Sequence, residues 1–179
     1  MKGYNSMIVQ SAAIAVFALS LITDAAAQST IQIGLVQPLT GAFAAAGTDV
    51  VNGAKIAADE INAKGGVLGK KLELITEDTK SNPTEAAAVA EKLIVRDKVP
   101  VLMGASASTA TLAVMPKLME YKVPMLVETS SSSKITTSGN PYIFRIAPPS
   151  EVEAVVFGKI VNRIVSAGSL LTPSPPSRS

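Results

Sequence analysis

Hydrophobic residues along this chain gather in short runs that alternate with longer, helix-like segments. The runs predict strands at Ile31–Val36, Lys71–Glu77, Pro100–Met103 and Pro124–Val127, with a short one near Tyr142–Arg145. The third and fourth runs are apolar throughout rather than alternating, which is typical of parallel strands covered by helices on both faces. We therefore expect an α/β fold built on an open parallel sheet with helices on both faces.

Two of the intervening segments carry clear helix signals. The first has apolar residues at helical spacing from Val50 to Ile61 and ends at Gly65-Gly66. The second opens with Asn82-Pro83, a good cap followed by proline at the first helical position. Glu85 is placed to reach back to that cap, and the helix should run to about Asp97.

Two further helices are predicted downstream. One spans roughly Ser108–Lys122 and contains Pro116, so we expect either a kink or a short turn followed by a fresh start. The other spans about Ser150–Ser166. Its apolar residues recur at helical spacing and should point inward: Val152, Val155, Val156, Ile160 and Ile164.

The two ends of the chain differ from this α/β pattern. Residues 1–27 have a basic start, an apolar stretch and Ala25-Ala26-Ala27 as a small-residue cleavage site, so we favour a cleaved export signal. The alternative is a membrane anchor, although the apolar run is shorter than the roughly 20 residues that spanning requires. Residues 28–166 carry the α/β pattern. Residues 167–179 are rich in proline and serine and predict a disordered or aberrant tail.

The composition removes several function classes. The chain has no histidine and no cysteine, which excludes disulfides, thiol chemistry, a Ser-His-Asp triad and histidine-based metal sites. The net charge of +2 is too mild to indicate nucleic acid binding. No phosphate-binding or dinucleotide glycine motif is present in the sequence. We expect a binding protein rather than an enzyme, with no cofactor and no metal.

Two hydroxyl-rich clusters follow predicted strands. Ser106, Ser108 and Thr109 lie after the third strand, where the start of a helix attracts anions. The favoured alternative is that Ser108 merely caps the helix. Capping the helix and contacting a ligand are compatible roles for this residue. Residues 128–133 follow the fourth strand, and composition alone would make them a flexible loop. Parallel strands end at one sheet edge, so both clusters can face one cleft. Glu128 is expected to face solvent or a structural partner rather than a ligand amine.

The motifs around these clusters resemble the periplasmic binding proteins that serve branched-chain amino acid ABC transporters. The resemblance is carried by the loop at residues 38–41, the block at residues 59–74 with its Ile-Asn-Ala-Lys-Gly-Gly core, and residues 77–83. The stretch Val101–Thr109 and the strand Val123–Val127 with its serines add to it. The match runs from about Ile31 to Val165.

The resemblance implies a type I periplasmic binding fold: two α/β lobes with a ligand in the cleft between them and a hinge-type closure. It implies that Ser106, Thr129 and Ser131 hold an amino acid's carboxylate and amine, with Ser108 and Thr109 next in order. Where relatives often place an aromatic residue in the first loop, this chain has Ala46. Relatives that bind amides, urea or aromatic acids share these motifs, so the exact ligand stays open.

The implied function is that of the solute-binding component of an ABC importer, located in the periplasm as a monomer. Its partners would be a small amino acid, or a related carboxylate or amide, and an inner-membrane permease. A ligand-sensing receptor domain of the same fold is the alternative. The chain resembles only the first part of lobe 1, incomplete and without the second lobe. By itself we expect it to be at best marginally folded and unable to bind ligand tightly.

Overall fold

The computed structural model describes the backbone of residues 30–171 and the side chains of residues 30–166. Within this part of the chain a single parallel sheet has the strand order β2-β1-β3-β4-β5. Its members are β1 (Ile31–Gln37), β2 (Leu72–Asp78), β3 (Leu102–Gly104), β4 (Met125–Val127) and β5 (Ile143–Arg145). The expected open parallel sheet is confirmed, with each strand shifted by no more than two residues at either end.

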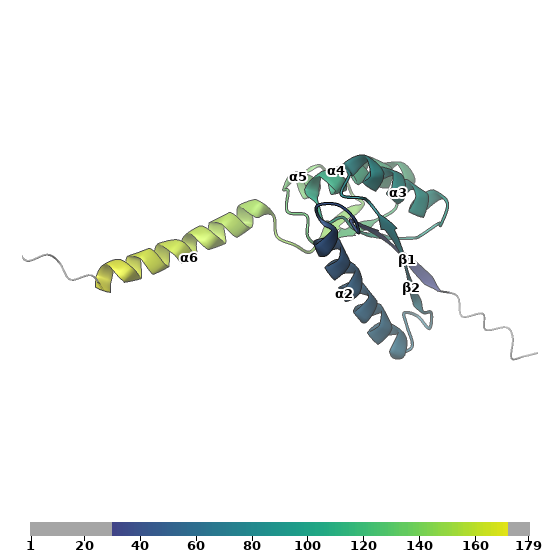
Figure 1. The fold of residues 1–179 in the computed structure, drawn as a ribbon, viewed down its shortest axis with the longest axis horizontal. Coiled ribbons are helices and arrows are strands. Elements are labelled where there is room, and N and C mark those ends of the chain that lie inside the picture. The colour runs from purple at the N-terminus through teal and green to yellow at the C-terminus, as the bar shows by residue number, and fades with distance from the viewer. Residues whose placement is uncertain (1–29, 172–179) are drawn as a thin grey trace, which may run out of the picture.

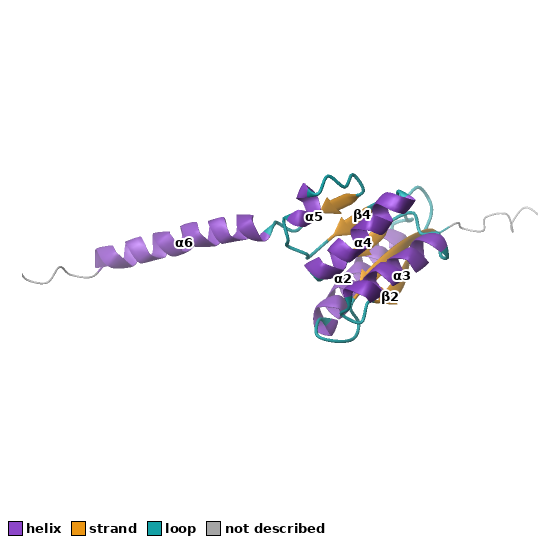
Figure 2. Ribbon diagram, turned by 90° about the horizontal axis from the view of Figure 1, so that it is seen from above, coloured by secondary structure: helices purple, strands orange, loops and turns teal. Residues whose placement is uncertain are grey.

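Helices follow each strand in turn, as Figure 1 shows. They are α2 (Ala44–Ala63), α3 (Pro83–Val95), α4 (Ser108–Tyr121), the short α5 (Lys134–Thr137) and α6 (Ser150–Leu171). The chain moves from β1 to β2 in one direction across the sheet and from β2 through β3 and β4 to β5 in the other. Because such crossovers share one hand, α2 and the pair α3 and α4 lie on opposite faces (Figure 2).

The principal core lies between the sheet and the layer of α3 and α4. Fully buried apolar residues of both layers meet there, among them Val36, Leu93, Leu102, Leu118 and Met125. On the opposite face α2 packs over β1 and β2 through small residues. The surface between them is lined by side chains such as Ile33, Leu74, Ala54 and Ala58. Helices therefore cover both faces of the sheet at β1, as predicted.

The helix boundaries follow the local signals. Asn82 caps α3, because its side-chain oxygen accepts hydrogen bonds from the backbone of Thr84 at 2.8 Å and Glu85 at 3.1 Å. The Glu85 carboxylate does not reach back to the cap; it pairs with Lys80 at 3.1 Å instead. α4 continues through the exposed Pro116 as one helix. Of the two expected outcomes, a kink or a short turn with a fresh start, the fresh start therefore does not occur.

The largest departure from the sequence prediction is α6. Its predicted inward residues are exposed: Val152 by 50%, Val155 by 57%, Val156 by 52%, Ile160 by 51% and Ile164 by 66%. In Figures 1 and 2 this helix projects away from the sheet and lies on neither face. Periodicity identifies the apolar face of a helix but not what covers that face. Here, no layer of the described residues covers the apolar face of α6.

α6 also extends beyond its predicted end. It reaches Leu171, whereas we expected a tail from residue 167. The sequence from Ala167 to Leu171 contains no proline, and Pro173 is the first residue that forbids continuation. Residues 172–179 and the predicted export signal at residues 1–27 lie outside the described residues. Among residues 30–171, no helix combines the length and hydrophobicity needed to cross a bilayer.

Candidate functional site

The hydroxyl-rich clusters meet at the carboxyl edge of the sheet, beside the point where the strand order reverses. β1 and β3 are neighbours, but the chain leaves β1 toward β2 and reaches β3 only afterwards. The two connections diverge on opposite faces, which opens a crevice at this place in parallel sheets. Gln37 ends β1, Ser106 follows β3 and Glu128 follows β4, so all three lie at this edge.

Three side chains form a hydrogen-bonded relay there. The Ser106 hydroxyl donates to Gln37 Oε1 at 2.7 Å, and Gln37 Nε2 donates to Glu128 Oε1 at 2.7 Å. Gln37 is fully buried, whereas Ser106 and Glu128 are partly exposed. A buried amide must satisfy both its donor and its acceptor, and these two neighbours do so. The relay thus fixes the orientation of all three side chains.

Glu128 lies in an unusual environment for a carboxylate. Burial raises its pKa above the ordinary value, although hydrogen bonds from the Gln37 side chain, its own backbone and the Thr129 hydroxyl oppose that rise. Its second oxygen, Oε2, is buried and has no hydrogen-bond partner among the described residues. The expectation that Glu128 faces solvent is therefore wrong, whereas its expected structural pairing is present with Gln37.

The two serine clusters are joined directly. The backbone N–H of Ser132 donates to the Ser108 hydroxyl at 3.2 Å. Two buried hydroxyls, those of Thr111 and Ser130, also join the clusters and lie 2.7 Å apart. The Ser130 hydroxyl donates to the carbonyl of Ala105 at 2.5 Å. These contacts support the prediction that both clusters share one edge. They also make the loop after β4 an ordered element rather than a flexible serine linker.

Ser108 does not cap its helix. The residue before α4 is Ala107, which has no capping side chain, and Ser108 occupies the first helical position. Its hydroxyl accepts from the neighbouring loop instead, so the favoured capping interpretation is wrong. The sequence cannot distinguish a cap from the residue after it, because helix boundaries shift by one or two positions.

The remaining candidate residues have different surroundings. Thr129 is exposed, and its hydroxyl donates to Glu128 Oε1 at 3.3 Å. Thr109 is exposed on the first turn of α4. Ser131 is partly buried, and its carbonyl accepts from the backbone of Ser150 at 2.9 Å and from the Ser150 hydroxyl at 3.2 Å. The structure therefore gathers Ser106, Thr129 and Glu128 around one relay, while Ser131 anchors the start of α6.

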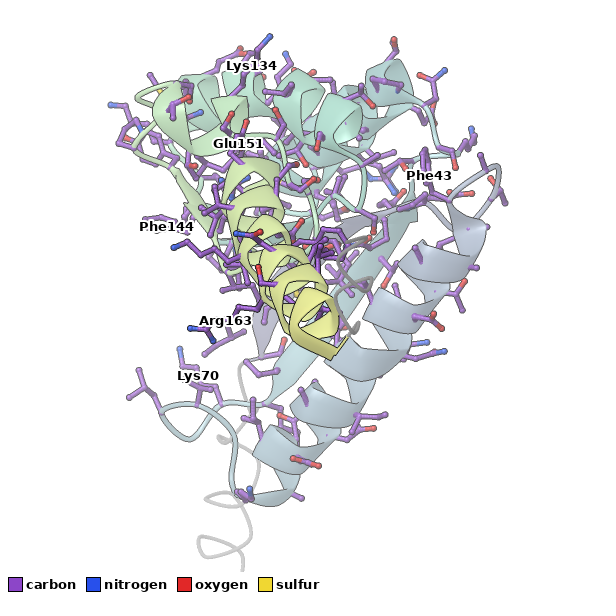
Figure 3. The ribbon with its side chains drawn as sticks, turned by 90° about the vertical axis from the view of Figure 1, so that its left-hand side faces the viewer. Phe43, Lys70, Lys134, Phe144, Glu151 and Arg163 are labelled. Carbon is purple, nitrogen blue, oxygen red and sulfur yellow. The ribbon has the colours of Figure 1, made fainter. Side chains whose placement is uncertain are left out.

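The loop after β1 is anchored by one carboxylate. Asp78 accepts from the backbone of Leu39 at 2.8 Å, Thr40 at 3.2 Å and Lys80 at 2.8 Å, and from the Thr40 hydroxyl at 2.7 Å. Burial alone would raise its pKa, but these hydrogen bonds outweigh it and lower the pKa. Phe43, 48% exposed, ends this loop at the start of α2 (Figure 3). It is thus an aromatic side chain in the first loop, even though position 46 is alanine.

Sequence reasoning missed Gln37. The available signal was a polar residue that closes an otherwise apolar strand, one position beyond the predicted strand end. The residues 30–166 contain no group of three or more acidic, histidine or cysteine side chains arranged to hold a metal ion. What the edge offers a ligand is therefore a set of hydroxyls, backbone groups and one partly buried carboxylate.

A family model described as "Periplasmic binding protein" matches residues 30–167. The chain belongs to the periplasmic binding protein family. This family consists of substrate-binding proteins, and the hydroxyl-rich loops at the switch point of the sheet are consistent with membership.

Two similar proteins have names that refer to branched-chain amino acids. The Leu/Ile/Val-binding protein BraC3 of Rhizobium johnstonii is 36% identical over 135 residues, which is 75% of this chain and 36% of that protein. The crystal structure of the branched-chain amino acid transporter substrate-binding protein LivJ of Streptococcus pneumoniae, in complex with isoleucine, superposes with a TM-score of 0.65. It is 36% identical and matches 68% of this chain and 34% of that one.

A third similar structure has another kind of ligand. The solute-binding protein of an ABC transporter from Rhodopseudomonas palustris, in complex with 3,4-dihydroxybenzoic acid, has a TM-score of 0.61 and 36% identity. The match covers 67% of this chain and 32% of that one. The present chain thus spans about a third of the length of the relatives that it matches.

Proposed function

We propose that this chain forms part of the extracytoplasmic solute-binding component of an ABC importer. The ligand would be a small amino acid of the branched-chain type or a related carboxylate or amide. The observation that carries the proposal is the meeting of two hydroxyl-rich loops with a hydrogen-bonded glutamine–glutamate pair at the switch point of a periplasmic-binding-protein sheet. Membership of that family, and relatives named for leucine, isoleucine and valine, support the ligand class.

The proposal assigns the ligand contacts to Ser106 and Thr129 first, then to Ser131, Ser108 and Thr109. Ser106 and Thr129 follow two different strands, and their hydroxyls donate to the Gln37 and Glu128 side chains of the relay. The role is binding and delivery, without catalysis. The protein would act in the periplasm as a monomer, exported by residues 1–27, and pass its ligand to an inner-membrane permease.

The test removes single hydroxyls from a complete binding protein. The matched segment of this chain would replace the corresponding segment of the Rhizobium johnstonii relative, and calorimetry would measure binding of leucine, isoleucine and valine. Ser106→Ala and Thr129→Ala should each weaken binding about ten- to a hundredfold, because a hydrogen bond to a charged group contributes about 1.5–3 kcal/mol.

The matched control is Thr30→Ala. Thr30 donates to Glu73 at 3.0 Å beside the start of β1, at the opposite edge of the sheet. Its loss should leave affinity unchanged. If neither site variant alters affinity while the hybrid still binds leucine, the ligand is held elsewhere. Binding of only a sugar or a metal ion would overturn the proposed ligand class.

A further inference from the structure

The turn between α2 and β2 ends in a large apolar side chain. The backbone N–H of Val67 donates to the carbonyl of Lys70 at 2.8 Å, and the N–H of Lys70 donates to the carbonyl of Val67 at 2.9 Å. Leu68 and Gly69 therefore form the tip of a tight two-residue turn. Leu68 is 93% exposed, more than any other large hydrophobic side chain of the described residues. The fold thus presents this leucine almost entirely to its surroundings.

The backbone at this tip suits other residues better than leucine. Leu68 has φ +52° and Gly69 has φ +75°. Two-residue turns with positive φ at both positions favour Asn-Gly, Asp-Gly or Gly-Gly. In the left-handed region, the Cβ atom of an L-residue lies too close to the following carbonyl oxygen. Leu68 therefore strains the turn while burying almost no surface, which points to a role for this side chain outside the fold.

The residues around the leucine are basic. Residues 61–72 contain three lysines and neither an acidic nor an aromatic residue. Lys64, Lys70 and Lys71 are exposed, and none of them forms an ion pair within residues 30–166. Lys64 follows the last residue of α2, where a cation complements the helix dipole. Lys70 and Lys71 lie beyond the helix, so the dipole does not explain them.

Further positive charge lies at the same edge of the sheet. Lys71 directly precedes β2, Lys98 precedes β3 and Lys122 precedes β4. The strands are parallel, so all three lysines lie at the amino edge, where the strands begin. Lys98 and Lys122 are also exposed and outside every ion pair of the described side chains. Figure 3 shows Lys70 at the end of the molecule opposite Lys134 of α5.

We propose that the turn at residues 64–71 docks reversibly on a bilayer rich in anionic phospholipids. Leu68 enters the boundary between the headgroups and the acyl chains, and Lys64, Lys70 and Lys71 lie against the lipid phosphates. Basic residues are attracted to an anionic leaflet, and an apolar side chain gains free energy by leaving water. Nucleic acid would match the lysines but not the leucine, and the turn has no aromatic side chain on which bases stack.

This inference goes beyond the proposed function. Docking through the amino edge leaves the candidate site, at the carboxyl edge, on the side away from the lipid. The protein would be held near the membrane while its site stays open to the aqueous space. One leucine and a few lysines give only weak attachment, because even a single long acyl chain binds membranes marginally. The docking is therefore reversible and depends on salt.

The experiment uses a fluorescent reporter at the tip. The chain has no tryptophan, so Leu68→Trp introduces a single one there. The full chain is mixed with vesicles of equal parts phosphatidylglycerol and phosphatidylcholine, or with vesicles of phosphatidylcholine alone. We expect the emission to shift to the blue only with the anionic vesicles, and brominated acyl chains in them to quench it. Added salt should reverse both effects.

The controls separate docking by the turn from adsorption through another apolar surface, such as the exposed face of α6. Ile56→Trp places the reporter at a 62% exposed position of α2 and should show no shift. Lys70→Glu with Lys71→Glu, added to Leu68→Trp, should weaken vesicle binding at least about tenfold. Lys134→Glu, at an exposed position near the opposite edge, should leave it unchanged.

A second variant keeps the test independent of the reporter. Leu68→Asn places a residue that the turn prefers at the strained position, so it should raise the melting temperature. It should also lower cosedimentation of the full chain with the anionic vesicles about tenfold, because the inserted side chain is lost. A variant with unchanged cosedimentation would show that Leu68 does not enter the lipid.

The other outcomes are equally decisive. An equal blue shift with both kinds of vesicle, or at both reporter positions, would assign binding to another surface and overturn the inference. Absence of any shift would overturn it too, and would leave an acidic protein surface as the partner of the lysines. None of these measurements involves the candidate site, so calorimetry with leucine tests the proposed function separately.

Discussion

At the scale of single residues, Gly47 sets how closely a helix approaches the candidate site. It is buried in the first turn of α2, and a Cβ atom there would overlap the carbonyl oxygen of Pro38. Pro38 directly follows Gln37, the buried centre of the relay. The absence of a side chain at position 47 therefore lets α2 begin against the strand end that carries the site.

Gly47→Ala should destabilise the fold by about 1–3 kcal/mol, because backbone atoms of Pro38 must move to admit the methyl group. Gly53→Ala is the matched control on the same helix. It meets nothing within 4 Å and should stabilise by about 0.5–1 kcal/mol through helix propensity. Urea denaturation measures both. Equal effects of the two substitutions would contradict the close approach.

The candidate residues show how far sequence reasoning reaches at this scale. The hydroxyl-rich positions could be found because they follow predicted strands, and parallel strands end at one edge. The hydrogen-bond partners of those hydroxyls could not be found from the sequence. Whether Ser106 bonds to a ligand or to Gln37, and whether Glu128 is exposed or buried, depends on the register between β1, β3 and β4. A single strand does not specify that register.

At the scale of elements, Asn62 explains part of the Ile-Asn-Ala-Lys-Gly-Gly block. Its side chain donates to the carbonyl of Leu72 at 2.9 Å and accepts from the N–H of Leu72 at 2.7 Å. The chain turns back toward β2 at Gly66, which adopts φ +77°. Only glycine fits at this position, because a Cβ atom there would overlap the carbonyl of Lys70. The block therefore clamps the end of α2 to the start of β2.

Asn62→Ala should lower the free energy of unfolding by about 1–3 kcal/mol, because it removes two hydrogen bonds to partly buried backbone groups. Asn52→Ala, at an exposed position of the same helix, should change it by less than about 0.5 kcal/mol. Chemical denaturation followed by circular dichroism gives both values. An Asn62 variant as stable as the Asn52 variant would show that the clamp contributes nothing.

Most elements were predictable because their signals are local. The apolar runs, the cap at Asn82 and the glycines after α2 each act within a few residues. α5 was missed because a four-residue helix in a serine-rich loop has no periodic pattern. The environment of α6 was missed for the opposite reason: its pattern is strong, but the pattern does not reveal whether another layer lies against it.

At the scale of the whole molecule, burial is distributed unevenly between the two ends of the sheet. β1 is flanked by strands on both sides and covered by helices on both faces. At the β5 edge, Phe144 is 56% and Ile146 68% exposed, and Figure 3 shows Phe144 pointing outward from the sheet. α6 is attached at its first turn, where Ser133 donates to Glu151 at 2.8 Å and Ser131 accepts from Ser150.

This distribution predicts which helix opens first. α6 has 22 residues and α3 has 13, so length alone would make α6 the more persistent. Burial gives the opposite order: α3 buries Ala86, Val89, Ala90, Leu93 and Ile94, whereas every described side chain of α6 is exposed. Most helical stability in proteins comes from the packing of an apolar face, so we expect burial to decide.

Hydrogen exchange of the full chain at low concentration, followed by mass spectrometry or NMR, tests this order. The backbone amides of α6 beyond its first turn should exchange with little protection, while those of α3 and β1 should exchange only on larger opening of the α/β body. Each segment serves as the internal control for the other, since both are measured in one sample. Protection of α6 equal to that of α3 would mean that another surface covers its valine and isoleucine face in solution.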